Sequence, residues 1–101
     1  MNYTARFSNT SIEKKFQKFL LAIPDKNTRE AIIERIERLQ ENPRPFGEKP
    51  FKQLTPPVEI YELVAQYRIR IGDYRVLYDV DDKRKIVWIL DIRKRSEGTY
   101  R

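Results

Sequence analysis

The sequence predicts an α+β fold, in which an N-terminal strand and a helical hairpin precede an antiparallel β-meander. Two observations support this prediction. Apolar residues recur at helical spacing between residues 10 and 42, whereas from residue 59 onward the chain consists of three β-rich runs. When helices come first and strands follow, the helices pack against one face of the sheet. We therefore expect a helical hairpin that covers one face of an antiparallel sheet.

The first two elements are predicted from alternation and from a capping signal. Residues 2–7 place aromatic or small residues on one side and polar residues on the other, which indicates a short half-buried strand. Thr10 followed by Glu13 has the spacing of a capping box, in which the two side chains satisfy the first free amides of a helix. The apolar stripe that follows predicts a helix from Thr10 to about Ala22.

A second helix and an irregular connection follow. Asn27 and Glu30 offer another capping box, and the next apolar stripe predicts a helix that ends near Asn42. Residues 42–57 hold five of the six prolines, which favours an irregular connection with one short strand around residues 51–54.

Three runs at residues 61–71, 74–81 and 85–92 predict the meander. Gly72 and Asp73 separate the first two runs, as expected of a tight two-residue turn, and a charged turn at residues 81–84 separates the last two. The third run is apolar on both of its alternations, which is typical of a strand covered on both faces. Its register therefore stays open.

The tight turn places three arginines on one face of the predicted hairpin. The apolar residues of the two strands oppose one another on the other face, which the helices must bury. These apolar pairs are Tyr67 with Tyr78, Ile69 with Val76, and Ile71 with Tyr74. Arg68, Arg70 and Arg75 then face outward, with Arg70 directly opposite Arg75, and paired like charges destabilise a hairpin. A bound polyanion would remove that repulsion, whereas an ion-pair network with Asp73, Asp79 and Asp91 is the structural alternative.

Composition limits the classes of function. The 101 residues suffice for a single domain spanning residues 1–101, and 21 Lys and Arg against 15 Asp and Glu give a formal charge of +6. Such a charge suits nucleic acid, an anionic membrane surface or an acidic protein. The chain has no cysteine and no histidine, which excludes disulfides, imidazole-based nucleases and the usual zinc sites. With neither a leader pattern nor an apolar run of about 20 residues, we expect a cytoplasmic protein that does not bind membranes.

The hairpin YRIRIGDYRVLYDV, the apolar strand after it, the IRKR segment and the penultimate tyrosine together resemble the RelE family within the RelE/ParE superfamily of toxins. The resemblance covers nearly the whole chain. It implies a toxin of a type II toxin–antitoxin module, namely a ribosome-dependent endoribonuclease that cuts mRNA in the A site of the small subunit and inhibits translation. It also implies a cognate antitoxin as partner. Two alternatives share the fold: a ParE-like toxin that inhibits DNA gyrase without cutting RNA, and a catalytically inactive domain that binds an antitoxin.

RNA cleavage by attack of the 2′-hydroxyl needs a positioned phosphate, a stabilised negative charge and two proton transfers, and it requires neither metal nor cofactor. By resemblance, Arg75 stabilises the transition state, Arg95 is the general acid and Tyr100 is the base. Tail spacing leaves Arg93 and Lys94 as other candidates for the acid. We also expect basic residues to bind the RNA phosphates: Arg68 and Arg70, at positions that the resemblance matches, and Lys49, Lys52, Arg93 and Lys94 near them. A solvated loop is the alternative for Lys49 and Lys52.

Overall fold

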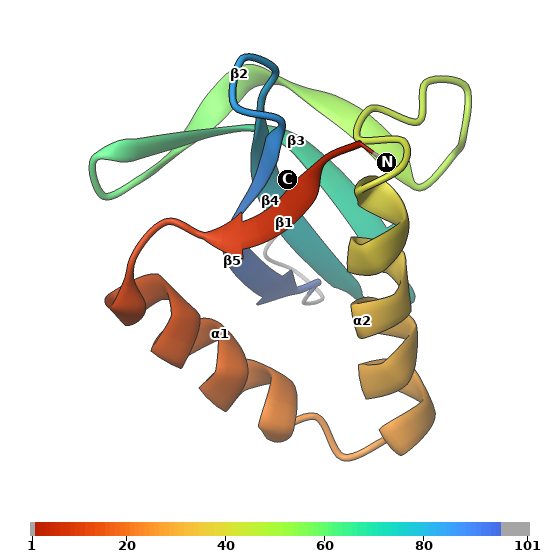
Figure 1. Ribbon diagram of the computed structural model, residues 1–101. Helices are drawn as coiled ribbons and strands as arrows, with labels where there is room; N and C mark the ends of the chain where they lie inside the picture. Colours follow the sequence, from red (N-terminus) through yellow and green to blue (C-terminus); the bar gives the residue numbers. More distant parts are fainter. Residues whose placement is uncertain (1, 96–101) are drawn as a thin grey trace.

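The structure, a computed structural model, describes residues 2–95 and contains two helices and five strands within them (Figure 1). The order matches the predicted α+β fold, with a strand and two helices before the meander. The elements are β1 (Thr4–Phe7), α1 (Thr10–Leu21), α2 (Lys26–Leu39), β2 (Phe51–Ile60), β3 (Leu63–Ile71), β4 (Tyr74–Asp81) and β5 (Ile86–Lys94). Neither helix is long and apolar enough to cross a membrane.

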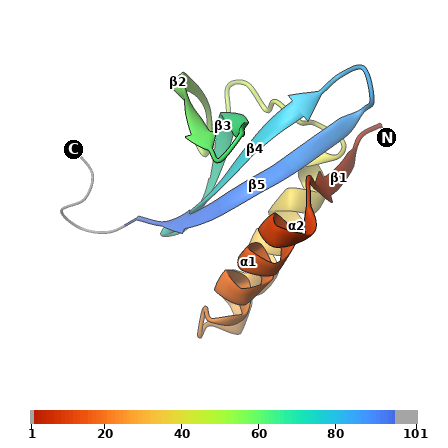
Figure 2. The same ribbon diagram turned by 90° about the vertical axis from the view of Figure 1, so that its left-hand side faces the viewer.

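The five strands form one mixed sheet in the order β1-β5-β4-β3-β2. Strands β2 to β5 are antiparallel neighbours, as the predicted meander requires, whereas β1 pairs with β5 in parallel. A parallel pair needs a long crossover, which the chain between the two strands supplies. Both helices lie on the same face of the sheet, so the opposite face over β3 and β4 is free of helices (Figure 2).

The predicted hairpin register is confirmed. Strands β3 and β4 pair Tyr67 with Tyr78 and Ile69 with Val76, and the side chains of these residues enter the core beneath the helices. Tyr78, Ile69 and Val76 are completely buried. At roughly 1.5–3 kcal/mol for each fully buried large apolar side chain, this face gives the hairpin much of its stability.

A β-bulge in β5 explains why that strand is apolar on both alternations. Leu77 and Tyr78 pair with Asp91 and Ile89, which leaves Leu90 as an extra residue in β5. Ile89 belongs to the core beneath the helices, while Leu90 packs with Leu77 in a second cluster. An inserted residue reverses the side-chain alternation beyond it, so sequence periodicity could not define the register.

Both predicted helix caps are wrong by one or two residues. The side chain of Asn9, not Thr10, accepts the first hydrogen bond of α1, from the Ile12 amide at 2.9 Å. Asp25 caps α2 and accepts from the Asn27 amide at 3.2 Å, so Asn27 already lies inside the helix. An N-cap needs an extended backbone and a short side-chain oxygen, and Asn9 and Asp25 supply both.

Strand β2 is longer than predicted. It runs to Ile60 instead of stopping near residue 54, and its pairing with β3 shifts between Gln53 and Val58. The two prolines of β2, Pro56 and Pro57, fall within this break in the pairing. Because β2 is an edge strand, prolines are tolerated there.

Two turn residues with positive φ move the starts of β3 and β5 to later residues than the sequence predicts. Tyr61 has φ of 58° and belongs to the β2–β3 turn, so β3 starts at Leu63 instead of the predicted residue 61. Lys85 has φ of 60° and likewise precedes β5, which then extends beyond residue 92 to Lys94. Strand β5 therefore reaches the tight β3–β4 turn.

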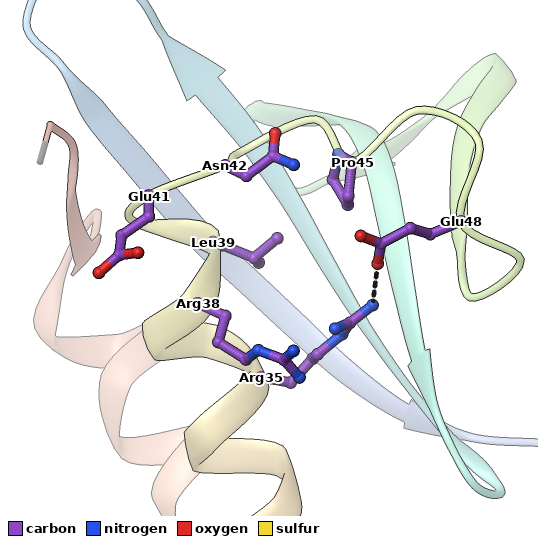
Figure 3. A pocket seen from close by; sticks show the side chains of 7 residues that line it. All are labelled: Arg35, Arg38, Leu39, Glu41, Asn42, Pro45 and Glu48. Carbon is purple, nitrogen blue, oxygen red and sulfur yellow. Dashed lines mark hydrogen bonds and ion pairs between the residues drawn. The ribbon is translucent and has the colours of Figure 1, made fainter.

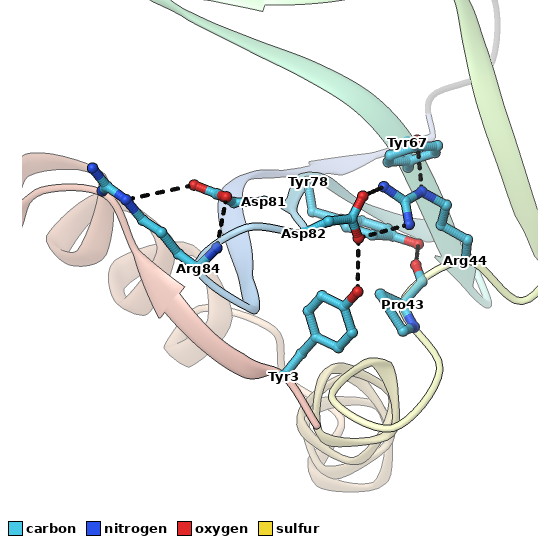
Figure 4. Close-up of polar contacts among 8 residues, drawn as sticks. All are labelled: Tyr3, Pro43, Arg44, Tyr67, Tyr78, Asp81, Asp82 and Arg84. Carbon is cyan, nitrogen blue, oxygen red and sulfur yellow. Dashed lines mark hydrogen bonds and ion pairs between the residues drawn. The ribbon is translucent and has the colours of Figure 1, made fainter. Parts of the chain in front are cut away.

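A polar cluster links the α2–β2 connection to the β4–β5 turn and to β3 (Figure 4). The Arg44 guanidinium donates to both carboxylate oxygens of Asp82 at 3.1 and 2.8 Å, and its Nε donates to the Tyr67 hydroxyl at 2.8 Å. The Tyr3 hydroxyl also donates to Asp82, at 2.7 Å. Hydrogen bonds from Arg44, and to a smaller extent from Tyr3, lower the pKa of Asp82 to about 2.

Candidate nucleic-acid interface

Four guanidinium groups gather on the sheet face opposite the helices. Arg68 and Arg70 lie on β3, Arg75 lies on β4, and Arg95 follows β5. Among the described residues, these four line a hollow of about 210 Å³, which we call the arginine recess. The pairing of Arg70 with Arg75 agrees with the register expected from the tight turn.

Arg68 is half-buried in the recess and bonds to the backbone of the α2–β2 connection. Its Nη1 donates to the carbonyl oxygen of Pro50 at 3.1 Å. Burial is the main cause that lowers its pKa, and the neighbouring guanidiniums of Arg75 and Arg70 lower it further. Sequence reasoning missed Pro50, because a backbone acceptor carries no signal in the residue type.

Arg75 lies at the centre of the positive charge. Burial is the largest cause that lowers its pKa, and the charges of Arg95, Arg93 and Arg70 lower it further. Arginine nevertheless stays protonated at neutral pH, so the recess holds several positive charges at close range. An added negative charge on a bound phosphate is the species that such an arrangement stabilises.

The end of β5 adds to the same face. Arg93 lies opposite Arg75, and its Nε donates to the Asp91 carboxylate at 2.8 Å. The Arg95 amide donates to the Asp73 carbonyl at 2.7 Å, which holds the chain beside the β3–β4 turn. Arg93 and Arg95 are therefore the two tail candidates that the structure brings to the recess side.

Lys94 points to the other face. It pairs with Tyr74, and its ammonium lies 6.0 Å from the centre of the Tyr74 ring. That ring packs edge-on against Phe19 of α1, on the helix side of the sheet. Of the three tail candidates for proton transfer, Lys94 is the one that the structure does not bring to the recess.

The remaining predicted residues lie at the margin or outside the described chain. Lys52 is exposed and pairs with Arg68 across β2 and β3, so it extends the basic face toward the sheet edge. Lys49 is exposed in the turn that precedes β2. The predicted base, Tyr100, lies outside the described residues, and the assigned catalytic roles stay predictions.

The alternative ion-pair network does not account for Arg68 and Arg70. Asp91 pairs with Arg93 instead. Within residues 2–95, no ion pair joins an acidic residue to Arg68 or Arg70. In the same part of the chain, no three acidic side chains come together in a way that could hold a metal ion.

Comparisons with known proteins place the chain in a family. The model of the ParE toxin of the type II toxin–antitoxin system parDE matches residues 11–98. The RelE1 protein of Methanocaldococcus jannaschii is 36% identical over 93 residues, which is 92% of this chain and 94% of that protein. The family model and the relative both describe small toxins of this kind. The chain belongs to the RelE/ParE superfamily of type II toxins.

Solved structures point to the RelE branch. RelE in the archaeal RelE–RelB complex from Pyrococcus horikoshii superposes with a TM-score of 0.72 at 28% identity, covering 97% of this chain and all of that one. A chain of the Mycobacterium tuberculosis toxin–antitoxin complex RelBE2 gives 0.62 at 27% identity, covering 94% of this chain and all of that one. Both relatives were crystallised as toxin–antitoxin complexes.

Proposed function

We propose that this toxin is a ribosome-dependent, metal-independent endoribonuclease that cuts mRNA in the A site of the small subunit and so inhibits translation in the cytoplasm. The observation that supports the proposal most is the arginine recess. Its guanidiniums converge on a volume large enough for a phosphate group. The helices leave this face of the sheet open (Figure 2). Arg is the residue that best matches phosphate geometry, through its planar fork of donors.

The reaction that suits this site uses the RNA as its own nucleophile. The 2′-oxygen attacks the adjacent phosphorus and loses its proton, and the 5′-oxygen of the next nucleotide leaves and gains one. Arg75 stabilises the extra negative charge on the phosphate, while Arg68 and Arg70 hold it in line. Arg95 and Tyr100 carry the proton transfers in this proposal, and Lys52 and Arg93 contact the flanking phosphates.

The same positive face explains how an antitoxin would silence the protein. RelE relatives were crystallised with RelB, and we propose a cognate antitoxin whose acidic residues cover the recess. Complementary charge speeds such an encounter and selects the partner.

This function can be tested by primer extension on mRNA taken from cells after brief induction of the protein. Cuts confined to translated reading frames, present with the wild type and lost with Arg75→Ala, are the expected result. Arg84→Ala is the matched control, since it removes the same charge at the β4–β5 turn away from the recess. Unchanged cutting by Arg75→Ala would remove the recess from the mechanism.

A gyrase-inhibiting toxin remains the second candidate, because the family model that matches residues 11–98 describes ParE. This candidate predicts growth arrest with intact mRNA and loss of supercoiling activity when purified gyrase is mixed with the protein. An inactive antitoxin-binding domain predicts neither arrest nor cleavage.

A further inference from the structure

The carbonyl of Pro50 joins the α2–β2 connection to the arginine recess. It accepts a hydrogen bond from the Arg70 amide at 3.0 Å and another from the Arg68 guanidinium at 3.1 Å. Three neighbouring guanidiniums repel one another, and this carbonyl is a partial negative charge that offsets part of the repulsion on Arg68. The position of the Pro50 carbonyl therefore determines the orientation of the Arg68 guanidinium.

The turn that ends at Pro50 is organised around Glu48. The Glu48 amide donates to the Pro45 carbonyl, and the Phe51 amide donates to the Glu48 carbonyl, both at 3.1 Å. The Glu48 carboxylate accepts from Arg35 of α2 at 2.8 Å, as drawn in Figure 3. Glu48 thus links the turn to the helix through its side chain.

On the side that faces α2, the connection borders a hollow instead of close packing. The ion pair borders a hollow of about 190 Å³ that lies between α2 and the connection and is lined by Leu39, Asn42 and Pro45 as well as by charged residues. The Arg35 side chain is only 17% exposed, so its guanidinium is held in place, while the Glu48 side chain is 50% exposed. An ion pair with one fixed, partly buried partner orients the other more firmly than a fully exposed pair does.

We infer that Arg35 and Glu48 are positioning residues of the arginine recess: their ion pair fixes the turn whose Pro50 carbonyl aims the Arg68 guanidinium at bound RNA phosphate. The inference rests on the proposed RNA-binding function and deepens it. Arg35 and Glu48 touch no substrate. Their effect on RNA passes through Pro50 to Arg68 alone.

Removing the charge of Glu48 distinguishes a positioning effect from a general electrostatic effect, because the two change RNA binding in opposite directions. Glu48→Gln removes a negative charge, which by long-range electrostatics alone would strengthen RNA binding. Loss of the positioning contact acts in the opposite direction. Glu30→Gln is the matched control, because it makes the same charge change at the exposed Lys26–Glu30 pair of α2, whose atoms lie 3.9 Å apart.

The experiment measures binding of a fluorescein-labelled single-stranded RNA oligonucleotide to the full chain by fluorescence anisotropy. We expect Glu48→Gln to weaken binding by about threefold to tenfold, as for partial loss of one charge-assisted hydrogen bond. Glu30→Gln should leave binding unchanged or slightly tighter. Arg35→Lys keeps the ion pair and should bind RNA nearly as well as the wild type. In an Arg68→Ala background, Glu48→Gln should cause no further loss.

Hydrogen exchange gives an independent readout. The Arg70 amide should exchange faster in Glu48→Gln than in the wild type, while the amides of β4 and β5 keep their rates. Equal effects of Glu48→Gln and Glu30→Gln on binding, additive losses with Arg68→Ala, or a uniform rise of all exchange rates would each overturn the inference alone. If Arg68→Ala itself leaves RNA binding intact, Arg68 is no phosphate ligand, and both the inference and that part of the proposed function are wrong.

Discussion

Arg70 and Arg75 face each other directly across β3 and β4, an arrangement that costs stability in a sheet. The apolar side chains on the buried face of the same two strands compensate for this repulsion. Ile69 and Val76, each next in sequence to one of these arginines, pair in the core and are fully buried. The hydrophobic gain on one face thus outweighs a repulsion on the other of a few tenths of a kcal/mol or more.

Replacing Arg75 tests that charge concentration. Arg75→Ala should reduce single-turnover cleavage of mRNA on programmed ribosomes by about 10²–10³-fold, the scale for losing one oriented donor to a developing oxyanion. Arg84→Ala should leave the cleavage rate unchanged. A wild-type cleavage rate in Arg75→Ala would show that the donor lies elsewhere.

Asp82 provides a pH-dependent prediction. Its folded-state pKa of about 2 lies below the unfolded value of about 3.9. The stability that it contributes is therefore fully present above about pH 4 and is lost as the pH falls toward 2. The difference in unfolding free energy between the wild type and Asp82→Asn should shrink over that range in urea titrations.

Tyr3→Phe is the graded control for this effect, because it removes one donor and leaves the Arg44 contacts in place. It should retain most of the pH dependence. A constant difference between wild type and Asp82→Asn from pH 4 to pH 2 would contradict the assigned role of Asp82.

At the scale of elements, the β3–β4 turn sets the register that builds the recess. Gly72 has φ of 59°, a backbone region that glycine enters freely and other residues enter at a cost. The next residue, Asp73, offers the carbonyl that accepts the Arg95 amide. One turn thus fixes both the pairing of Arg70 with Arg75 and the approach of the tail.

Substitution at the turn should expose this requirement. Gly72→Ala should destabilise the protein by about 1 kcal/mol, since a Cβ meets no atom there within 4 Å and backbone strain is the dominant cost. Gly72→Asn should cost less, because asparagine tolerates this conformation. Chemical denaturation measures both, and equal stability of the alanine and glycine proteins would show that the turn adopts another conformation.

Helix α1 offers a test of its corrected N-terminus. Asn9→Ala should cost about 1 kcal/mol of unfolding free energy, because the Ile12 amide loses its side-chain acceptor. Thr10→Ala should cost clearly less, since Thr10 is the first helical residue and does not provide the cap. A larger loss for Thr10→Ala would restore the cap expected from the sequence.

The whole molecule separates its chemistry from its packing across the sheet. The helices cover one face (Figure 2), whereas the arginine recess opens on the other. The formal charge of +6 gives a general attraction to RNA, but the recess concentrates that charge where a phosphate can bind.

Salt dependence should reveal this concentration. For single-stranded RNA, each neutralised phosphate contributes about 0.7 to the slope of log affinity against log salt. Arg70→Ala should reduce that slope by about this amount, whereas Arg84→Ala should leave it unchanged. Equal slopes for the two variants would indicate that RNA binds by diffuse charge and not in the recess.

The sequence by itself determined the order of elements, the hairpin register and the shared face of Arg68, Arg70 and Arg75. These follow from local periodicity and from one glycine turn, which nearby residues encode. Tertiary structure decided the parallel β1–β5 pair, the bulge at Leu90, the long β2 and the Pro50 contact. Each of these depends on partners distant in sequence or on backbone atoms, to which residue type and spacing give no guide.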